Sequence, residues 1–192
     1  MQNLFTGWKD VELTEQGIAE AVQAGQEILD RQMIFDVAFT SELKRAQETL
    51  RLILEKSNQE SCPVTRDQAL NERDYGDLTG KNKDQARAEF GEDQVHIWRR
   101  SYDIPPPGGE SLKDTEERTW PYFESTVLPL LAQGKTVIVA AHGNSLRAII
   151  KRLEGISSED ITQLEIATGV PIYYHIAADG QVTSKDSPSK VA

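Results

Sequence analysis

The first candidate catalytic residue is His142, which lies between an apolar run and a Gly-Asn-Ser sequence. The run, residues 137–141, predicts a buried strand covered on both faces. In open α/β sheets, ligands bind in the crevice outside the carboxyl ends of such strands. Asn144 or Ser145 can cap the helix expected next, and a helix N-terminus attracts anions. Two interpretations stand at this point: an active-site histidine, or a buried histidine satisfied by a backbone partner.

A carboxylate in a polar loop is a natural partner for such a histidine in acid–base chemistry. Residues 70–80 form a polar loop with an aromatic side chain and glycines, and loops on rigid scaffolds often carry function. Glu72 stands there beside Arg73 and Asp74. It is either one member of a solvated charge mixture or an acid–base group whose pKa is tuned by burial.

Cationic side chains recur at places that suit a bound anion. Arg45 is expected in the first turn of a helix, where a cation opposes the helix dipole at a cost of about 0.3–1 kcal/mol unless an anion binds there. Arg99 and Arg100 follow an aromatic residue, and guanidinium groups suit phosphate and carboxylate. Lys83 adds a further positive charge. Solvated surface cations are the alternative for each. Together with the histidine and the glutamate, they indicate phosphate-ester chemistry, with covalent transfer through a histidine and clamping of the phosphoryl oxygens.

Composition narrows the classes of protein. The 192 residues fit one domain, and the net charge of −10 argues against a general nucleic-acid or membrane surface. Cys62 is the only cysteine, which excludes an intrachain disulfide and favours a reducing, cytoplasmic location. The sequence shows no signal peptide, bilayer-spanning apolar run, metal-ligand spacing or glycine-rich nucleotide loop. We therefore expect no metal and no nucleic-acid or membrane partner.

Helices and strands must position these groups. In the first half of the chain, Thr14 is expected to cap a helix, residues 35–40 predict a strand, and Ser41 is expected to cap a second helix. Residues 62–66 predict an edge strand because a proline there cannot donate to a ladder. Residues 83–90 predict a further helix.

The second half continues the alternation. A Pro-Pro-Pro-Gly-Gly segment breaks the chain and is the best candidate for a linker. After it, Ser111 and Asp114 predict a capping box for a long helix, which Pro121 should kink or restart. Residues 169–176 predict a strand that pairs back through an Asp-Gly turn with residues 181–186. The alternation predicts one layered α/β domain with a largely parallel sheet.

Several short motifs, in order along the chain, carry a resemblance. They are Phe-Thr-Gly-Trp (5–8), Thr-Ser-Glu-Leu-Lys-Arg-Ala (40–46), Leu-Asn-Glu-Arg-Asp-Tyr-Gly (70–76), Trp-Arg-Arg (98–100) and Ala-His-Gly-Asn-Ser-Leu-Arg (141–147). With them the sequence resembles the 2,3-bisphosphoglycerate-dependent phosphoglycerate mutases, a family of the histidine phosphatase superfamily. The likeness covers essentially the whole chain, and the short segment at 105–111 is similar to that of the compact bacterial members.

The resemblance implies a fold and an activity. The fold would be a three-layer α/β/α sandwich with a mostly parallel sheet. The reaction would interconvert 3-phosphoglycerate and 2-phosphoglycerate, in glycolysis and gluconeogenesis, through a phosphohistidine primed by 2,3-bisphosphoglycerate and without a metal. The family forms dimers or tetramers, so a homo-oligomer is expected.

The resemblance also implies a role for each matching position. Glu72 would be the proton donor and acceptor for the substrate hydroxyl, His142 the second histidine at the transferring phosphoryl group, and Arg45 its clamp. Arg99, Arg100, Tyr75 and Lys83 would hold the carboxylate and outer phosphate of phosphoglycerate. The remaining pocket residues would be Thr6, Gly7, Gly143 and Asn144.

One motif of the family has no counterpart here. Members begin with a strand that ends in Arg-His-Gly, whose histidine is the nucleophile, and the 192 residues contain no Arg-His-Gly. The resemblance therefore implies a single domain, 1–192, that is N-terminally truncated and lacks the first, central strand. Such a gap leaves backbone groups of two strands unpaired, at about 1–3 kcal/mol for each buried group.

Three hypotheses about function follow. The chain is a phosphoglycerate mutase without its nucleophile segment, a phosphatase on the same scaffold, or a non-catalytic remnant that binds phosphorylated ligands or a partner chain. On the first hypothesis, the 192 residues alone have no mutase activity, and an upstream segment ending in Arg-His-Gly restores it.

Overall fold

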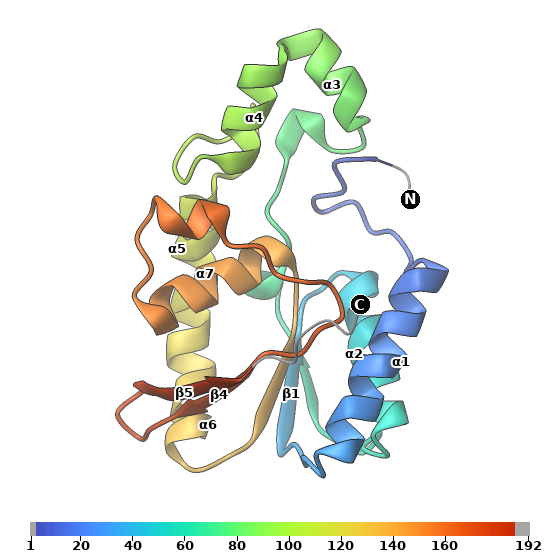
Figure 1. Cartoon of the computed structure of the whole chain (residues 1–192), viewed down its shortest axis with the longest axis vertical. Helices are drawn as coiled ribbons and strands as arrows, with labels where there is room; N and C mark the ends of the chain where they lie inside the picture. Colours follow the sequence, from blue (N-terminus) through green and yellow to red (C-terminus); the bar gives the residue numbers. More distant parts are fainter. Residues whose placement is uncertain (1–2, 187–192) are drawn as a thin grey trace.

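A computed structural model describes residues 3–186, and a small parallel sheet lies at its centre (Figure 1). Its strands are β1 (Val37–Thr40), β2 (Val64–Arg66) and β3 (Val137–Ala140), in the order β2-β1-β3. Ala38 pairs with Val64 on one side and with Ile138 on the other. The carboxyl ends of β1 and β3 therefore lie side by side, as the sequence analysis requires for a site at that edge.

Helices α1 (Glu15–Asp30) and α2 (Lys44–Lys56) cover one face of this sheet (Figure 1). Thr14 caps α1 by accepting a hydrogen bond from the Gly17 N–H, as predicted. Gly25 lets the two helices approach closely, because a Cβ there would lie 2.7 Å from the Lys56 Cβ and 2.8 Å from the Ile53 carbonyl oxygen. The core of this layer consists of Ala24, Ile28, Phe35, Ala38, Leu50, Ile53, Leu54 and Ala140.

The opposite face is covered by α5 (Leu112–Tyr122), the π-helical turn η3 (Phe123–Val127), α6 (Leu128–Ala132) and α7 (Gly143–Glu154). The predicted capping box of Ser111 and Asp114 starts α5. Pro121 lies within α5, and a π turn directly follows this helix, so the helical path continues with a local irregularity close to the proline. The buried residues of this layer are Phe39, Leu70, Phe123, Val127 and Ile149. The three-layer α/β/α arrangement is confirmed.

A hairpin forms a second, separate sheet. β4 (Tyr173–Ile176) and β5 (Val182–Asp186) pair antiparallel with each other, and Asp179 and Gly180 lie in the turn between them. Within residues 3–186, β3 is an edge strand, so Val137, Ile138 and Val139 are only half-buried. The prediction of a strand fully buried on both faces is wrong for these residues, although their side chains do contribute to both cores.

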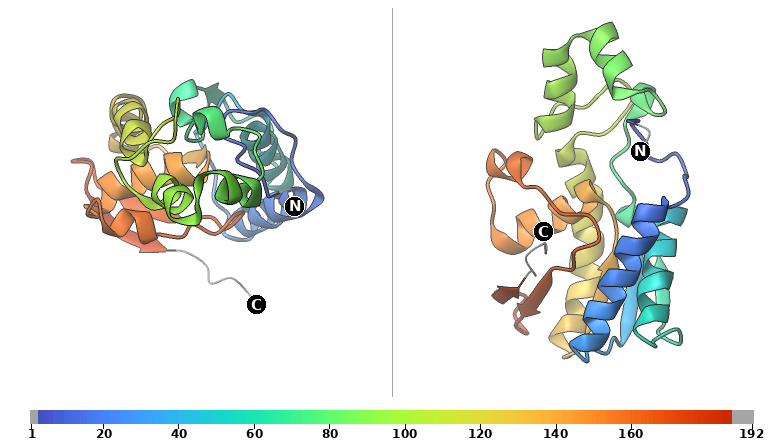
Figure 2. Two further views of the ribbon diagram at one scale, coloured as in Figure 1. Left: turned by 90° about the horizontal axis from the view of Figure 1, so that it is seen from above. Right: turned by 45° about the vertical axis from the view of Figure 1, so that its right-hand side comes forward.

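A lobe rises beyond the carboxyl ends of the strands (Figures 1 and 2). It contains α3 (Lys83–Phe90) and α4 (Glu92–Arg100), and α3 has the predicted bounds. The chain start crosses its base, where the Phe5 N–H donates to the Lys81 carbonyl and the Gly80 N–H to that of Phe5. The small core of the lobe consists of Phe5, Leu78, Ala86, Val95 and Trp98. Short 3₁₀ turns η1 (Gln68–Leu70), η2 (Gly76–Leu78) and η4 (Asp160–Gln163) complete the elements.

Two predicted caps and the linker need correction. The N-cap of α2 is Leu43, and Ser41 accepts a hydrogen bond from the Leu43 N–H just before this helix. The N-cap of α7 is His142, which precedes the predicted caps Asn144 and Ser145.

The Pro-Pro-Pro-Gly-Gly segment, residues 105–109, does not separate two domains. The Asp77 N–H donates to the Pro107 carbonyl, and a side chain at Gly76 would collide with the backbone of this segment. The segment therefore packs on the polar loop 70–80, because Gly76 leaves room for its backbone.

Candidate functional site

His142 and Ser41 meet at the carboxyl edge of the sheet. Both are buried, and the His142 Nε2 lies 2.8 Å from the Ser41 Oγ. Ser41 directly follows β1 and His142 comes two residues after the end of β3, and the register of these strands brings the two side chains together. Ser145 Oγ accepts the His142 N–H, which ties the histidine to the first turn of α7. The ring is thus fixed at a helix N-terminus, a place that favours anions.

Glu72 lies beside this histidine, held by α7 and by its own loop. Its Oε1 accepts from the Asn144 Nδ2 at 2.9 Å, the Asn144 N–H at 3.2 Å and the Arg73 N–H at 2.7 Å. A Cβ on Gly143 would lie 4.0 Å from the Glu72 Oε2, so this glycine borders the carboxylate directly. The loop and the N-terminus of α7, which are far apart in sequence, therefore both donate hydrogen bonds to the Glu72 carboxylate.

Burial and hydrogen bonding set the charges of this pair. Burial lowers the pKa of His142 from 6.5 to about 4, against the pull of the Glu72 carboxylate, so the ring is neutral at pH 7. Burial alone would raise the pKa of Glu72, but the His142 ring and the hydrogen-bond donors together bring it below its ordinary value. Since the ring is neutral at pH 7, we attribute the ionised state of Glu72 at that pH chiefly to the donors of Arg73 and Asn144.

Arg118 on α5 holds the backbone of the Glu72 loop through hydrogen bonds. Its guanidinium donates to the carbonyls of Ala69 (2.9 Å), Asn71 (3.1 Å) and Glu72 (2.9 Å) and pairs bidentately with Glu110. Glu110 in turn accepts the Asp74 N–H at 3.0 Å. These contacts fix the loop on both sides of Glu72.

Arg45 reaches the same region from the first turn of α2. It donates to the Gly7 carbonyl at 2.8 Å and to the Lys9 carbonyl at 3.1 Å. Burial lowers the pKa of Arg45, while Glu72 and Asp10 act in the opposite direction. The turn that presents Gly7 begins at Thr6, whose carbonyl accepts the Lys9 N–H. Arg45 therefore lies close enough to Glu72 for the two charges to interact, and its hydrogen bonds hold it to residues 7 and 9.

Tyr75, Lys83 and Arg99 line the base of the α3–α4 lobe. The ring of Tyr75 packs 5.1 Å from that of Phe5, and a Cβ on Gly7 would lie 3.2 Å from the Tyr75 backbone N. Burial lowers the pKa of Lys83, and the positive charge of Arg99 lowers it further. Burial also lowers the pKa of Arg99, and the charges of neighbouring arginines act in the same direction. Cations are thus gathered in a partly desolvated place.

Arg73 joins this group as a fully buried arginine, 2% exposed. Its Nη2 contacts the Tyr75 hydroxyl and the Arg99 carbonyl, while its Nε has no partner among the described residues. Within residues 3–186, the ion pairs include no carboxylate partner for Arg45, Arg73, Lys83 or Arg99. In a chain with a net charge of −10, such a concentration of unpaired cations indicates an anion site.

Arg100 differs from the other predicted cations because it is paired. Its Nη1 lies 2.7 Å from a carboxylate oxygen of Glu165, in the loop before β4. The structure thus brings the predicted site residues into one region, with Arg100 already neutralised. Their catalytic and binding roles remain proposals.

Several residues of this region were not predicted as part of a site. Ser41 was expected to cap a helix, Arg73 was expected in a mixture of charges, and Arg118 and Glu110 had no predicted role. Ser41 directly follows β1 and His142 lies just beyond β3, and a polar residue at the carboxyl end of a strand was a usable signal. For Arg118 and Glu110 no local signal exists, because their partners lie on a distant loop.

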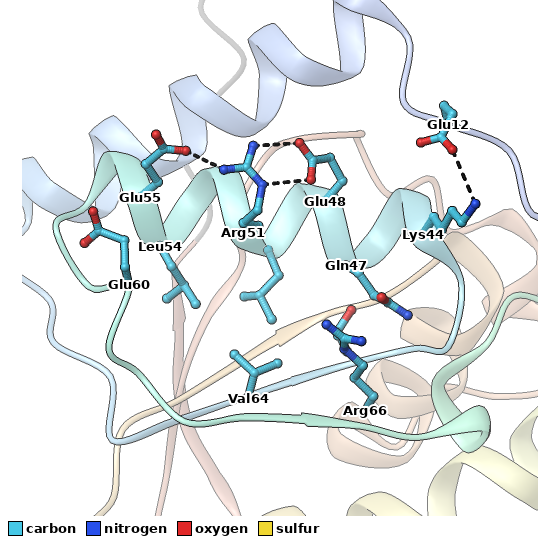
Figure 3. A pocket seen from close by; sticks show the side chains of 12 residues that line it. Glu12, Lys44, Gln47, Glu48, Arg51, Leu54, Glu55, Glu60, Val64 and Arg66 are labelled. Atoms are coloured by element: carbon cyan, nitrogen blue, oxygen red, sulfur yellow. Dashed lines mark hydrogen bonds and ion pairs between the residues drawn. The ribbon is translucent and has the colours of Figure 1, made fainter.

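Among residues 3–186, no group of three or more His, Cys, Asp or Glu side chains lies close enough to hold a metal ion, and no helix is long and apolar enough to cross a membrane. A separate cavity of about 630 Å³ lies between α2 and β2 (Figure 3). The charges that line this cavity largely pair with one another, as Arg51 does with Glu48 and Glu55.

Known proteins resemble both the sequence and this arrangement. The family described as Histidine phosphatase superfamily (branch 1) matches residues 1–184. The chain belongs to the histidine phosphatase superfamily, branch 1. Among its relatives in this superfamily, a protein of Bradyrhizobium sp. (strain BTAi1) named 2,3-bisphosphoglycerate-dependent phosphoglycerate mutase is 60% identical over 96% of this chain and 89% of its own. A protein of Mesorhizobium japonicum with the same name is 59% identical over 97% of this chain and 90% of its own.

Solved structures of the superfamily share the fold. Bacillus stearothermophilus YhfR superposes with a TM-score of 0.81 at 21% identity, covering 94% of this chain and 86% of its own. The alpha-ribazole phosphatase from Shigella flexneri superposes with a TM-score of 0.72 at 26% identity, covering 88% of this chain and 80% of its own. The superfamily therefore includes phosphatases as well as mutases on the same architecture.

Proposed function

We propose that this protein interconverts 3-phosphoglycerate and 2-phosphoglycerate through a phosphohistidine primed by 2,3-bisphosphoglycerate. One observation supports this most strongly: Glu72 is held at the start of α7 beside the buried His142, near cations that have no carboxylate partner among the ion pairs of residues 3–186. A phosphoglycerate carries a phosphate, a carboxylate and a hydroxyl. The two anionic groups match the cations on either side of Glu72, and the hydroxyl matches Glu72 as a proton acceptor. The names of relatives about 60% identical to this chain agree with the proposal.

Glu72 is the proposed acid–base group. When a phosphoryl group is transferred to the substrate hydroxyl, the hydroxyl proton leaves, and the ionised carboxylate accepts it. When the other phosphoryl group departs, Glu72 returns the proton to the oxygen left behind. The carboxylate ends ionised, as it began, so one residue serves both directions of the isomerisation.

His142 and Arg45 are the proposed partners of the transferring phosphoryl group. A neutral imidazole can donate an N–H to a phosphoryl oxygen, and the N-terminus of α7, at Gly143, adds its positive dipole end. Arg45 would supply a full positive charge. Thr6 and Gly7 would border the same pocket through short groups, and we propose that Asn144 holds Glu72.

The α3–α4 lobe is the proposed seat of the substrate's other anionic group. Arg99 and Arg100 present guanidinium forks, which match a carboxylate or phosphate. Lys83 adds charge, and Tyr75 a hydroxyl. Their separation from His142 would allow one end of a small diacid to be held while the other end reacts.

We propose that none of the histidines among the 192 residues is the phosphorylated one. In the family it stands in Arg-His-Gly, which the 192 residues lack, and 2,3-bisphosphoglycerate supplies its phosphoryl group. His142 is proposed as its neighbour and not as the acceptor. We further propose that residues 1–192 act as one domain.

The test is an assay of 2-phosphoglycerate formation and of phosphate release from 3-phosphoglycerate. The 192-residue chain alone should form no product. The chain preceded by a strand segment ending in Arg-His-Gly should form 2-phosphoglycerate in a 2,3-bisphosphoglycerate-dependent manner, and Glu72→Gln should abolish most of it. Phosphate release without isomerisation would support a phosphatase. A folded extended chain with neither activity would favour a non-catalytic binding protein.

A homo-oligomer is proposed as well. β2 is an edge strand with Val64 45% exposed, and two such edges can pair antiparallel about a twofold axis. Arg66 and Glu60, which border the cavity beside β2, offer opposite charges to a second copy (Figure 3). Light scattering should give a multiple of the chain mass that Val64→Lys reduces, whereas a monomeric wild-type chain would contradict this. A cytoplasmic location and a part in glycolysis and gluconeogenesis complete the proposal.

A further inference from the structure

Arg100 contacts a neighbouring loop of the same chain. Its Nη1 lies 2.7 Å from the Glu165 Oε1 and donates to the Thr162 carbonyl at 3.4 Å. Both contacts come from the segment between α7 and β4. An arginine at the mouth of the site is thus neutralised by a carboxylate of the chain itself.

The same carboxylate faces a second guanidinium that connects to the site. The Glu165 Oε2 lies 3.7 Å from the Arg147 Nη2. Arg147 donates to the Leu164 carbonyl at 2.8 Å and to the Asn144 Oδ1 at 3.3 Å. Asn144 in turn holds Glu72. Glu165 therefore lies where two cations from α4 and α7 converge.

The exposure of Glu165 shows that this contact can be exchanged. Its side chain is 70% exposed, while that of Arg147 is 15% exposed. An exposed carboxylate keeps much of its hydration, so its ion pair adds little to folding stability and opens at small cost. The loop can hold its position through the Arg147 bond to the Leu164 carbonyl without this carboxylate.

We propose that Glu165 is an internal competitor of anionic ligands at Arg100, and that the carboxylate or phosphate of a substrate displaces it. Glu165 carries the same group as a glycerate substrate, and it pairs with Arg100, whereas the neighbouring Arg99 has no carboxylate partner among the ion pairs of residues 3–186. Its presence weakens ligand binding and favours ligands with enough negative charge to displace it. This inference rests on the proposed binding of phosphoglycerates.

Calorimetric titration of the 192-residue chain with 3-phosphoglycerate tests the competition. At fixed ionic strength, Glu165→Gln should lower the Kd by about two- to fivefold, the range expected for release of an exposed ion pair. Glu117→Gln is the matched control, because it removes one charge from an exposed pair with Lys113 on α5. In an Arg100→Met chain, Glu165→Gln should give no gain.

The outcomes separate this inference from the proposed function. Equal gains in Glu165→Gln and Glu117→Gln would reduce the effect to net charge and overturn the inference, as would weaker binding in Glu165→Gln. Inorganic phosphate serves as a second probe. If 3-phosphoglycerate binds no variant while phosphate binds Glu165→Gln more tightly in an Arg100-dependent manner, the proposed function fails and the competition stands. No gain with either probe overturns the competition.

Discussion

Two arginine-containing regions flank Glu72, and they differ in whether their arginines have carboxylate partners within the described residues. On the α5 side, Arg118 has acceptors from the backbone of the loop and from Glu110. On the lobe side, Arg73 and Arg99 have no carboxylate partner among residues 3–186. An arginine saturated by its own protein positions other groups, whereas a desolvated arginine without a counterion is suited to receive a ligand.

Arg118→Met should break the first region with the largest effect on stability. The change leaves Glu110 without its partner and frees the carbonyls around Glu72, so we expect the free energy of unfolding to fall by about 3–5 kcal/mol. Urea denaturation measures this loss. The double variant Arg118→Met with Glu110→Met should recover part of it, because no carboxylate is then left unpaired. A loss below about 1 kcal/mol would contradict the positioning role.

The pH dependence of stability should reveal the buried neutral His142. Its pKa is about 4 in the folded chain against an ordinary 6.5, so protons bind the unfolded chain more readily between these values. Its contribution is present above about pH 6.5 and is lost as pH falls toward 4. The loss is about 3 kcal/mol.

His142→Asn provides the reference, because asparagine also suits the N-cap position of α7. Denaturant unfolding at pH 7 and pH 4 should give a decrease about 3 kcal/mol larger for the wild-type chain than for this variant. Equal decreases would show that the ring is not held neutral by burial.

Arg99→Met in the second region should change stability little and ligand affinity strongly, in contrast to Arg118→Met. Removing a cation without a carboxylate partner should change the free energy of unfolding by no more than about 0.5 kcal/mol. The Kd for 3-phosphoglycerate should rise by about tenfold or more, the usual worth of a hydrogen bond to a charged group. Paired unfolding and titration experiments check this. A large stability loss with unchanged affinity would remove the contrast between the two regions.

Local sequence rules predicted the elements that depend on local contacts. Thr14 caps α1, Ser111 and Asp114 start α5, and α3 has the predicted bounds, because capping and periodicity act within a few residues. The position of His142 at the end of a strand also followed from the apolar run before it.

The contacts that shape the site were beyond such rules. Arg118 reaches a carbonyl 46 residues away, and Ser41 meets a histidine 101 residues away. Nothing near Glu165 in the sequence indicates that it faces Arg100. These pairings depend on how the loops pack on the sheet, and periodicity carries no information about that. The half-burial of β3 likewise follows from its place at the sheet edge and not from its composition.

The most direct test of the account compares 3-phosphoglycerate with glycerol 3-phosphate, which lacks the carboxylate, in calorimetric titrations of the 192-residue chain. The unpaired cations of the lobe should make 3-phosphoglycerate bind at least about tenfold more tightly. Arg99→Met should abolish most of that preference. Equal affinities for the two ligands, or a preference that survives in Arg99→Met, would contradict the assignment of this region to a phosphoglycerate.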